Sequence, residues 1–403
     1  MLAILLLVPS LNLWLGEWTY GRWMMVHMNT ALFGWASLPM VAFLLHAYRV
    51  DSGALATWCR PVVWLWSAAL LAGCCSWLGG HSSGKLFLDW SGFPRLFFPL
   101  ALVALWVLLA MAFVHRPGDG VSRVAKVAGL LVLLAVPFAL YFASDPTVYP
   151  RINPDTGGPT GQSQLESSLG VVLILLAVPF GIAPRKRHTG RAVWLAWVVF
   201  AAESLLCFAL GRADVSHRVL AQWLSLASLL LWIPLVPAYY RAFTWRAATR
   251  SWQIAFLCWW AALVLTGWFL FLPGILDRVK FTDVLVGHSL TAVAGFLSAL
   301  LLFVLVQLLD EQDTWVLTRR WSFLAWNLGV AAYVVVMSIS GWMEFGNPEF
   351  TIIPGTARAV LYTLRLLTGL AMLAASLDWW VSSFSFSSAA SAKPSTALEA
   401  EAA

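Results

Sequence analysis

The chain has 403 residues, of which 61% are hydrophobic and only 11% are charged, and its formal net charge is +6. No water-soluble fold of this length could bury so much apolar surface, so the composition excludes a soluble globular protein and indicates a polytopic membrane protein. The sequence contains no phosphate-binding loop and no basic, aromatic-interleaved patch, which argues against nucleic acid as a partner and leaves the lipid bilayer as the expected one.

Twelve apolar segments follow one another along the chain, and most reach the roughly 20 residues that a helix needs to cross a bilayer. Together they predict an all-α bundle of about 12 transmembrane helices, a single domain over 1–381. The Ser/Ala-rich tail at 382–403 is expected to be disordered. The segments lie near 1–15, 24–47, 62–80, 96–114, 127–144, 169–184, 192–211, 219–240, 252–273, 283–309, 322–342 and 359–381.

Positive charge between the segments predicts their orientation. The connections that follow the second, fourth, sixth, eighth and tenth segments carry 14 Lys and Arg residues together. The connections on the opposite side carry 9. Connections rich in Lys and Arg stay in the cytoplasm, so the first set is assigned to that side. With twelve crossings, both termini are then predicted to be cytoplasmic.

Two histidines lie at a comparable depth in two segments that enter from the same side. His27 lies in "WTYGRWMMVHMNTALFGWASLPM", and His288 lies in "FTDVLVGHSLTAVAGF". Imidazole is a common metal ligand, and two helices could hold a flat metal cofactor between such residues. In the alternative interpretation each ring hydrogen-bonds to a neighbouring helix or to interfacial water, and both interpretations stay open at this point.

The residues around both histidines resemble the catalytic subunit of heme–copper oxidases, cytochrome c oxidase subunit I, most closely its C-type branch. "TYGRWMMVHMNTALFGWAS" is similar to the second helix of that family, where a Tyr-Gly-Arg turn precedes a heme-binding His-x-Asn, here His27 and Asn29. "FTDVLVGHSLTAVAGF" resembles the tenth helix, which supplies the high-spin heme ligand, here His288. "WNLGVAAYVVVMSISGWME" and "YTLRLLTGL" look like the two helices that follow.

This resemblance implies a set of cofactors, partners and a location. One or more b-type hemes would be bound, with His27 and His288 as iron ligands. The expected location is a bacterial inner membrane, and the expected partners are respiratory-chain subunits or a cytochrome c.

The chain also departs from the family pattern. Leu290 stands where the tenth helix of the family has a second histidine, so His27 lacks its usual partner across the heme. The approach to segment 169–184 contains no histidine, and "CFALGRADVSHRVLAQWLSL" contains only His217. Copper prefers a compact set of nitrogen ligands, so a copper site is not expected and normal dioxygen reduction is doubtful. Whether the protein is an enzyme therefore stays open.

Other ionisable residues lie in or beside the apolar segments. Glu203 near the middle of its segment is either a proton or quinone contact or a neutral acid that bonds to the next helix. Arg365 could pair with Glu203 or with a heme propionate, and Arg22 is better placed for a propionate. Lys85 and Asp89 could line the same mouth or serve as interfacial anchors.

The segment "YPRINPDTGGPTGQS", 149–163, is rich in Pro and Gly and predicts a loop with several tight turns. It could cap a pocket, dock a partner or simply connect two helices.

Two classes of function remain. The first is an oxidase-like heme protein that transfers electrons or binds a diatomic gas. The alternative is a membrane scaffold, an assembly subunit or a carrier of a small lipophilic molecule that keeps the fold without redox chemistry. An unrelated transporter is a third and more distant class, because no inverted repeat is evident.

Overall fold

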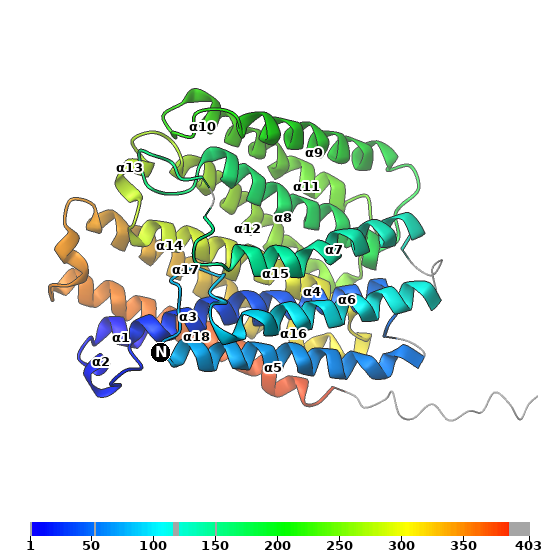
Figure 1. Ribbon diagram of the computed structural model, residues 1–403, viewed down its shortest axis with the longest axis horizontal. Coiled ribbons are helices and arrows are strands. Elements are labelled where there is room, and N and C mark those ends of the chain that lie inside the picture. Colours follow the sequence, from blue (N-terminus) through cyan, green and yellow to red (C-terminus); the bar gives the residue numbers. More distant parts are fainter. Residues whose placement is uncertain (1, 52–53, 116–120, 150, 387–403) are drawn as a thin grey trace, which may run out of the picture.

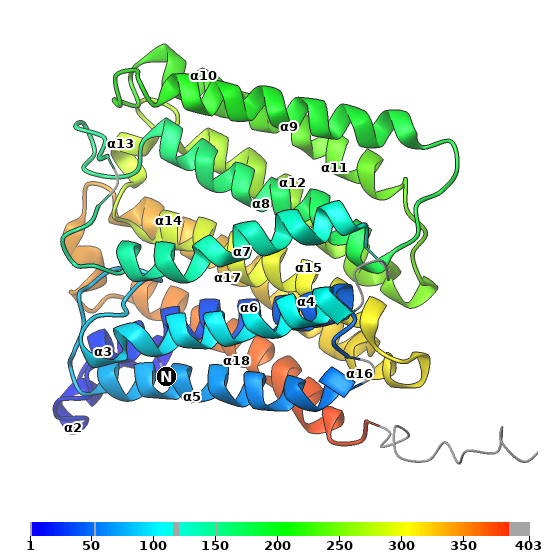
Figure 2. The same ribbon diagram turned by 45° about the vertical axis from the view of Figure 1, so that its right-hand side comes forward.

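The computed structural model describes residues 2–51, 54–115, 121–149 and 151–386, and they form a bundle of long helices lying side by side (Figures 1 and 2). Apart from one isolated bridge between Arg185 and Phe243, these residues form no β structure. Eleven helical stretches among them are long and apolar enough to cross a membrane. The protein is therefore an all-helical, multi-pass membrane protein.

The first six crossings are α3 (Tyr20–Thr30), η1 (Ala31–Ala36) and α4 (Ser37–Ala47) together; η2 (Ala54–Trp58) with α5 (Cys59–Leu78); η3 (Phe93–Leu96) with α6 (Phe97–His115); α7 (Arg123–Ala143); α8 (Gly161–Ile182); and α9 (Gly190–Leu210). The remaining crossings are α10 (Leu220–Ala227) with η4 (Ser228–Leu231) and α11 (Trp232–Tyr240); η5 (Ala247–Thr249) with α12 (Arg250–Leu270); α14 (Asp283–Leu290) with η6 (Thr291–Leu297) and α15 (Ser298–Leu308); α17 (Arg320–Glu344); and α18 (Thr356–Ser383). Short helices outside them are α1 (Leu2–Leu7), α2 (Leu11–Trp14), α13 (Leu276–Val279), η7 (Glu311–Asp313), α16 (Trp315–Thr318) and η8 (Pro348–Thr351).

The predicted segment 1–15 is not a crossing. It forms two short helices, α1 and α2, separated by a turn at Pro9 and Ser10, because proline cannot continue the hydrogen-bond ladder of α1. Both helices lie at the end of the bundle where α3 begins, called here the α1 end, and Arg358 Nη2 of α18 donates to Leu6 O at 2.9 Å.

The helices near the two ends of the described chain lie far apart. With eleven crossings in the described residues, α1 and the end of α18 lie at opposite ends of the bundle (Figure 1). The cytoplasmic placement of both termini stays a prediction. Of the predicted tail, residues 387–403 lie outside the described part of the chain.

The crossing that carries His288 lies at the centre of the bundle. In its most apolar stretch 61% of the residues are buried, against 17–39% in the other crossings. α4 and α12 pack against α15, and α17 packs against α14. Trp35 Nε1 of the first crossing donates to Ser298 Oγ at 2.7 Å, so the two histidine-bearing crossings are joined directly.

Candidate cofactor site

The two histidines begin the same eleven-residue pattern. "HMNTALFGWAS", 27–37, and "HSLTAVAGFLS", 288–298, share His-x-x-Thr-Ala-x-x-Gly-aromatic-x-Ser. The predictions above compared each histidine with an outside family and missed this internal repeat, although it is visible in the sequence. We call each copy a histidine module.

The two histidine modules also fold alike. Each winds from an α-helix into a π-helix, η1 or η6, shortly after its histidine. In both, the threonine hydroxyl donates to the carbonyl four residues earlier, at 2.6 Å and 3.1 Å. In both, the serine hydroxyl donates to the carbonyl five residues earlier, at 2.7 Å and 2.8 Å. π-Helical turns are rare and concentrate at functional sites, so their presence in both modules indicates a shared role.

His288 is held against α12 in a defined orientation. Its Nδ1 lies 3.0 Å from Thr266 Oγ1, and that hydroxyl donates its own hydrogen to Ala262 O at 2.7 Å. With its hydrogen directed at Ala262 O, the threonine oxygen accepts from Nδ1–H in the tautomer that leaves the lone pair on Nε2 free. A ring fixed through one nitrogen with the other free is the arrangement that a metal-ligating histidine requires.

Glycine leaves room beside the free nitrogen of His288. A Cβ placed on Gly267 of α12 would lie 3.2 Å from His288 Cε1 and 3.5 Å from Nε2. A side chain at position 267 would press against the imidazole, so glycine lets the ring of His288 lie close to α12. The chain thus provides an oriented imidazole, which fits a metal-ligating histidine.

His27 differs from His288 in its surroundings. It is exposed, and among the described residues its ring takes part in no hydrogen bond or ion pair. Asn29 is fully buried, donates to Met25 O at 2.9 Å and accepts from the backbone N–H of Asp89 at 3.4 Å. Residues two apart point to nearly opposite sides of a helix, so Asn29 does not share the face that presents His27.

Arg22, Lys85 and Asp89, the residues predicted at a polar mouth, all make hydrogen bonds at the α1 end. Arg22 Nη1 donates to Leu78 O at 2.9 Å and pairs with Glu17 at 3.2 Å. Lys85 is buried and donates to three loop carbonyls between residues 143 and 148. Asp89 is fully buried and accepts from the Ser83 N–H at 2.6 Å. Lys85 and Asp89 therefore hold the loops at the α1 end together.

Arg365 does not pair with Glu203. Its Nη1 lies 3.2 Å from Asp283 Oδ2, and its Nε donates to Tyr333 Oη at 2.8 Å. Glu203 instead accepts from Trp232 Nε1 at 2.5 Å. Asp283 opens α14 only five residues before His288, so this network fixes the helix that carries the histidine against α17 and α18.

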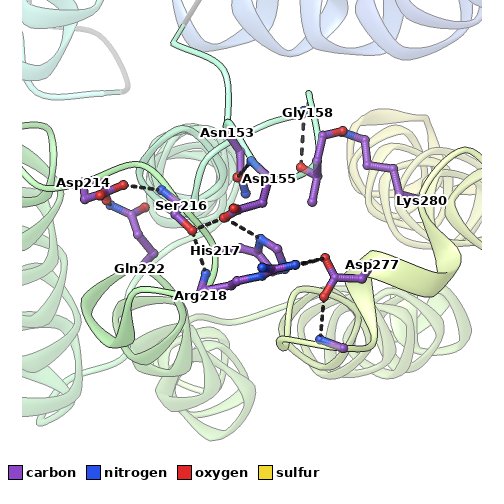
Figure 3. Close-up of polar contacts among 12 residues, drawn as sticks. Asn153, Asp155, Gly158, Asp214, Ser216, His217, Arg218, Gln222, Asp277 and Lys280 are labelled. Atoms are coloured by element: carbon purple, nitrogen blue, oxygen red, sulfur yellow. Dashed lines mark hydrogen bonds and ion pairs between the residues drawn. The ribbon is translucent and has the colours of Figure 1, made fainter.

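A second polar cluster surrounds His217 at the α1 end (Figure 3). The buried ring of His217 lies between two carboxylates, with Nε2 at 3.1 Å from Asp277 Oδ1 and Nδ1 at 3.6 Å from Asp155 Oδ2. Asp155 belongs to the Pro/Gly-rich loop, and Lys280 Nζ donates to Thr156 O at 2.5 Å in the same loop. The loop thus has the tight turns that its composition predicts, and these contacts hold it against its neighbours.

Acid is expected to loosen this loop. Burial raises the pKa of Asp277, but the N–H of Gly274 and the nearby His217 and Arg218 outweigh it and hold that pKa below its ordinary 3.8. A lowered carboxyl pKa stabilises the folded state above 3.8, and the contribution is lost as the pH falls through the lower folded-state value. The rate of amide hydrogen exchange at 151–160, corrected for its intrinsic pH dependence, should be constant from neutrality down to about pH 3.8. Below that pH the rate should rise. In Asp277→Asn the exchange at 151–160 should be fast at every pH. An exchange rate equal to that of the wild type would refute the role of Asp277 in holding the loop.

No protein-family model matches the chain, and no curated protein matches it. Among the described residues, no group of three or more His, Cys, Asp and Glu side chains is placed to hold a metal ion. A heme iron takes only one or two protein ligands, so the lack of such a group among the described residues does not bear on heme. By its fold the chain belongs to the class of multi-pass helical membrane proteins.

Proposed function

We propose that this protein is an oxidase-like membrane protein that binds b-type heme for electron transfer or for binding a diatomic gas. The observation that carries the proposal is the pair of histidine modules, which share a sequence pattern, a π-helical turn and the same hydrogen bonds. The resemblance to heme–copper oxidase subunit I supports the same ligand. A heme would supply a redox-active iron that exchanges one electron or takes up a gas molecule.

The residues of the chain have separate roles in this proposal. His288 would hold the heme iron through Nε2, and Thr266 would fix the tautomer and ring plane of the imidazole from the other nitrogen. His27 provides a second ligand or contacts the heme edge from the first crossing. Since Leu290 cannot ligate iron, no second histidine follows His288, and a heme held by His288 alone would be able to bind a gas.

The first test is a visible difference spectrum of the purified full-length protein, reduced minus oxidised, with and without carbon monoxide. We expect a b-type spectrum that shifts with carbon monoxide and disappears in His288→Ala, because the axial ligand is removed. His115→Ala, which changes an exposed histidine at the opposite end of the bundle, is the matched control and should keep the spectrum. A folded protein that remains colourless when produced with ample heme would refute the heme proposal and favour the scaffold or carrier alternative.

A further inference from the structure

Two connections at the end of the bundle opposite α1 lie against each other (Figures 1 and 2). One joins α8 to α9, and the other joins α11 to η5. The Lys186 N–H donates to Ala242 O at 2.9 Å, and the Thr244 N–H donates to Pro184 O at 3.0 Å. These hydrogen bonds bring together two segments that lie far apart in the sequence.

Gln307 of α15 holds both connections. Its Nε2 donates to Ile182 O, the last residue of α8, at 3.2 Å, and its Oε1 accepts from the Arg246 N–H at 3.2 Å. Thr189 Oγ1, directly before α9, donates to Ala242 O at 3.3 Å. The backbone that carries the charged residues of both connections is therefore held in place.

The same two segments are uniformly basic. Residues 183–191 and 241–250 contain seven Lys and Arg residues and no Asp or Glu. Five of the seven lie beside the hydrogen bonds that join the connections, are exposed, and make no side-chain hydrogen bond or ion pair among the described residues. These five, called here the basic patch, are Arg185, Lys186, Arg187, Arg191 and Arg241.

The basic patch has no counter-charge within the described part of the chain. Like charges gathered on one surface repel one another and destabilise the folded state unless an anion lies among them. At the same end of the bundle Arg319 has such a partner, since its Nη1 lies 2.6 Å from Asp378 Oδ1. We therefore expect the patch to take its counter-charge from an anion outside the chain.

Exposed aromatic side chains lie next to the patch. Trp194 is 67% exposed and follows Arg191 by three residues on α9, so the two side chains are neighbours on the helix surface. Phe180 near the end of α8 is also exposed, and the centroid of its ring lies 5.4 Å from that of Phe243. Exposed aromatic rings near the end of a crossing lie at the membrane interface. The surface thus offers cations for a headgroup and rings for the chains of the same lipid.

We propose that the basic patch binds the phosphate headgroup of an anionic phospholipid in the leaflet at this end of the bundle. Arginine forms paired hydrogen bonds with phosphate oxygens, and residues from both connections hold one headgroup. The two connections are among those predicted to be cytoplasmic, and anionic lipids give the cytoplasmic leaflet its negative surface potential. This site does not depend on bound heme.

Native mass spectrometry of the full-length protein in detergent, titrated with phosphatidylglycerol, tests the proposal. We expect phosphatidylglycerol to bind more tightly than phosphatidylcholine with the same chains, which has no net charge. Lys186→Gln and Arg241→Gln, one from each connection, should each raise the dissociation constant for phosphatidylglycerol about fivefold, the effect of one cation near anionic lipid. Both side chains are exposed and make no hydrogen bond or ion pair with the described residues, so both variants should stay folded.

Arg123→Gln is the matched control, because it removes an exposed cation at the same end of the bundle, at the start of α7. It should leave the dissociation constant for phosphatidylglycerol unchanged. Equal binding of the two lipids, or equal weakening in Arg123→Gln and Lys186→Gln, would overturn the proposed site.

Competition with inorganic phosphate identifies the occupant. Inorganic phosphate carries the charge of a headgroup but has no chains to lie against Trp194. We expect it to leave bound phosphatidylglycerol in place when both are added at the same concentration. Displacement by inorganic phosphate would show a site for a free anion and would overturn the assignment to a lipid.

Discussion

Gly341→Ala is expected to lower the free energy of unfolding by about 3 kcal/mol, the upper end of the usual cost of overpacking. A Cβ at position 341 of α17 would lie 2.1 Å from the backbone nitrogen of Val284 and 2.8 Å from the carbonyl carbon of Asp283. Both atoms belong to the backbone of α14, so no rotation of a flexible side chain relieves the contact. The two helices must separate, or α14 must shift along its axis.

Unfolding in mixed micelles with increasing denaturing detergent measures this effect. Gly170→Ala is the matched control, because nothing lies within 4 Å of its added Cβ and it is also a helical residue of a crossing. We expect Gly170→Ala to be neutral or slightly stabilising, since alanine is the better helix former. Equal stability of Gly341→Ala and the wild type would show that α14 and α17 are not in contact at this point.

The same substitution has a consequence for the histidine site. α14 carries His288 less than two turns after Asp283, so a displaced α14 moves the ring away from Thr266. If heme is bound as proposed, its absorption maximum should shift in Gly341→Ala at temperatures where the protein is still folded. Gly170→Ala should leave the maximum in place.

Local features of the sequence predicted most of the helices. Apolar runs of crossing length identified the segments from 24–47 onward, because a long uncharged run has only the helix as a stable form in a bilayer. The failure came at 1–15, where Pro9 divides a run that hydropathy alone treats as continuous. The repeat that His27 and His288 share is also visible in the sequence. The sequence does not show that both copies form a π-helical turn, and only the structure reveals this likeness.

Contacts between distant residues could not be predicted in the same way. Lys85 was predicted to line a mouth or to anchor an interface, and the structure adds contacts between its ammonium group and carbonyls about 60 residues later in the chain. Backbone carbonyls carry no sequence signal, so only the folded loops reveal them. The pairing of Arg365 with Asp283 instead of Glu203 was hidden for a similar reason, because the rotation of each helix about its axis decides which charges meet.

Breaking the pair between Arg365 and Asp283 is expected to destabilise the protein more than any other single polar substitution at the α1 end. The side chains are only 10% and 16% exposed, and their closest atoms lie 3.2 Å apart. Removing one member of a buried ion pair leaves the other charge without compensation, which costs about 3 kcal/mol or more. In Arg365→Gln, the Asp283 carboxylate would remain beside Glu344, whose carboxyl accepts from the Asp283 N–H at 2.9 Å.

A double-mutant cycle separates the charge effect from packing. Asp283→Asn combined with Arg365→Gln removes both charges and keeps both shapes, so the double variant should be more stable than Arg365→Gln alone. We expect a coupling energy of about 2 kcal/mol, near the upper part of the range for residues in contact. Tyr333→Phe removes only the hydroxyl that accepts from Arg365 and should cost about 1 kcal/mol.

The alternative outcome of this cycle is additivity. If Arg365 acted only by filling space between α17 and α18, the two single losses would sum in the double variant and Tyr333→Phe would have no effect. Coupling would instead show that the charged end of α14 is fixed by electrostatics, and this end lies five residues before His288. The position of His288 would then depend on two things. One is the buried ion pair at the start of α14, and the other is the apolar packing of the crossing that α14 begins.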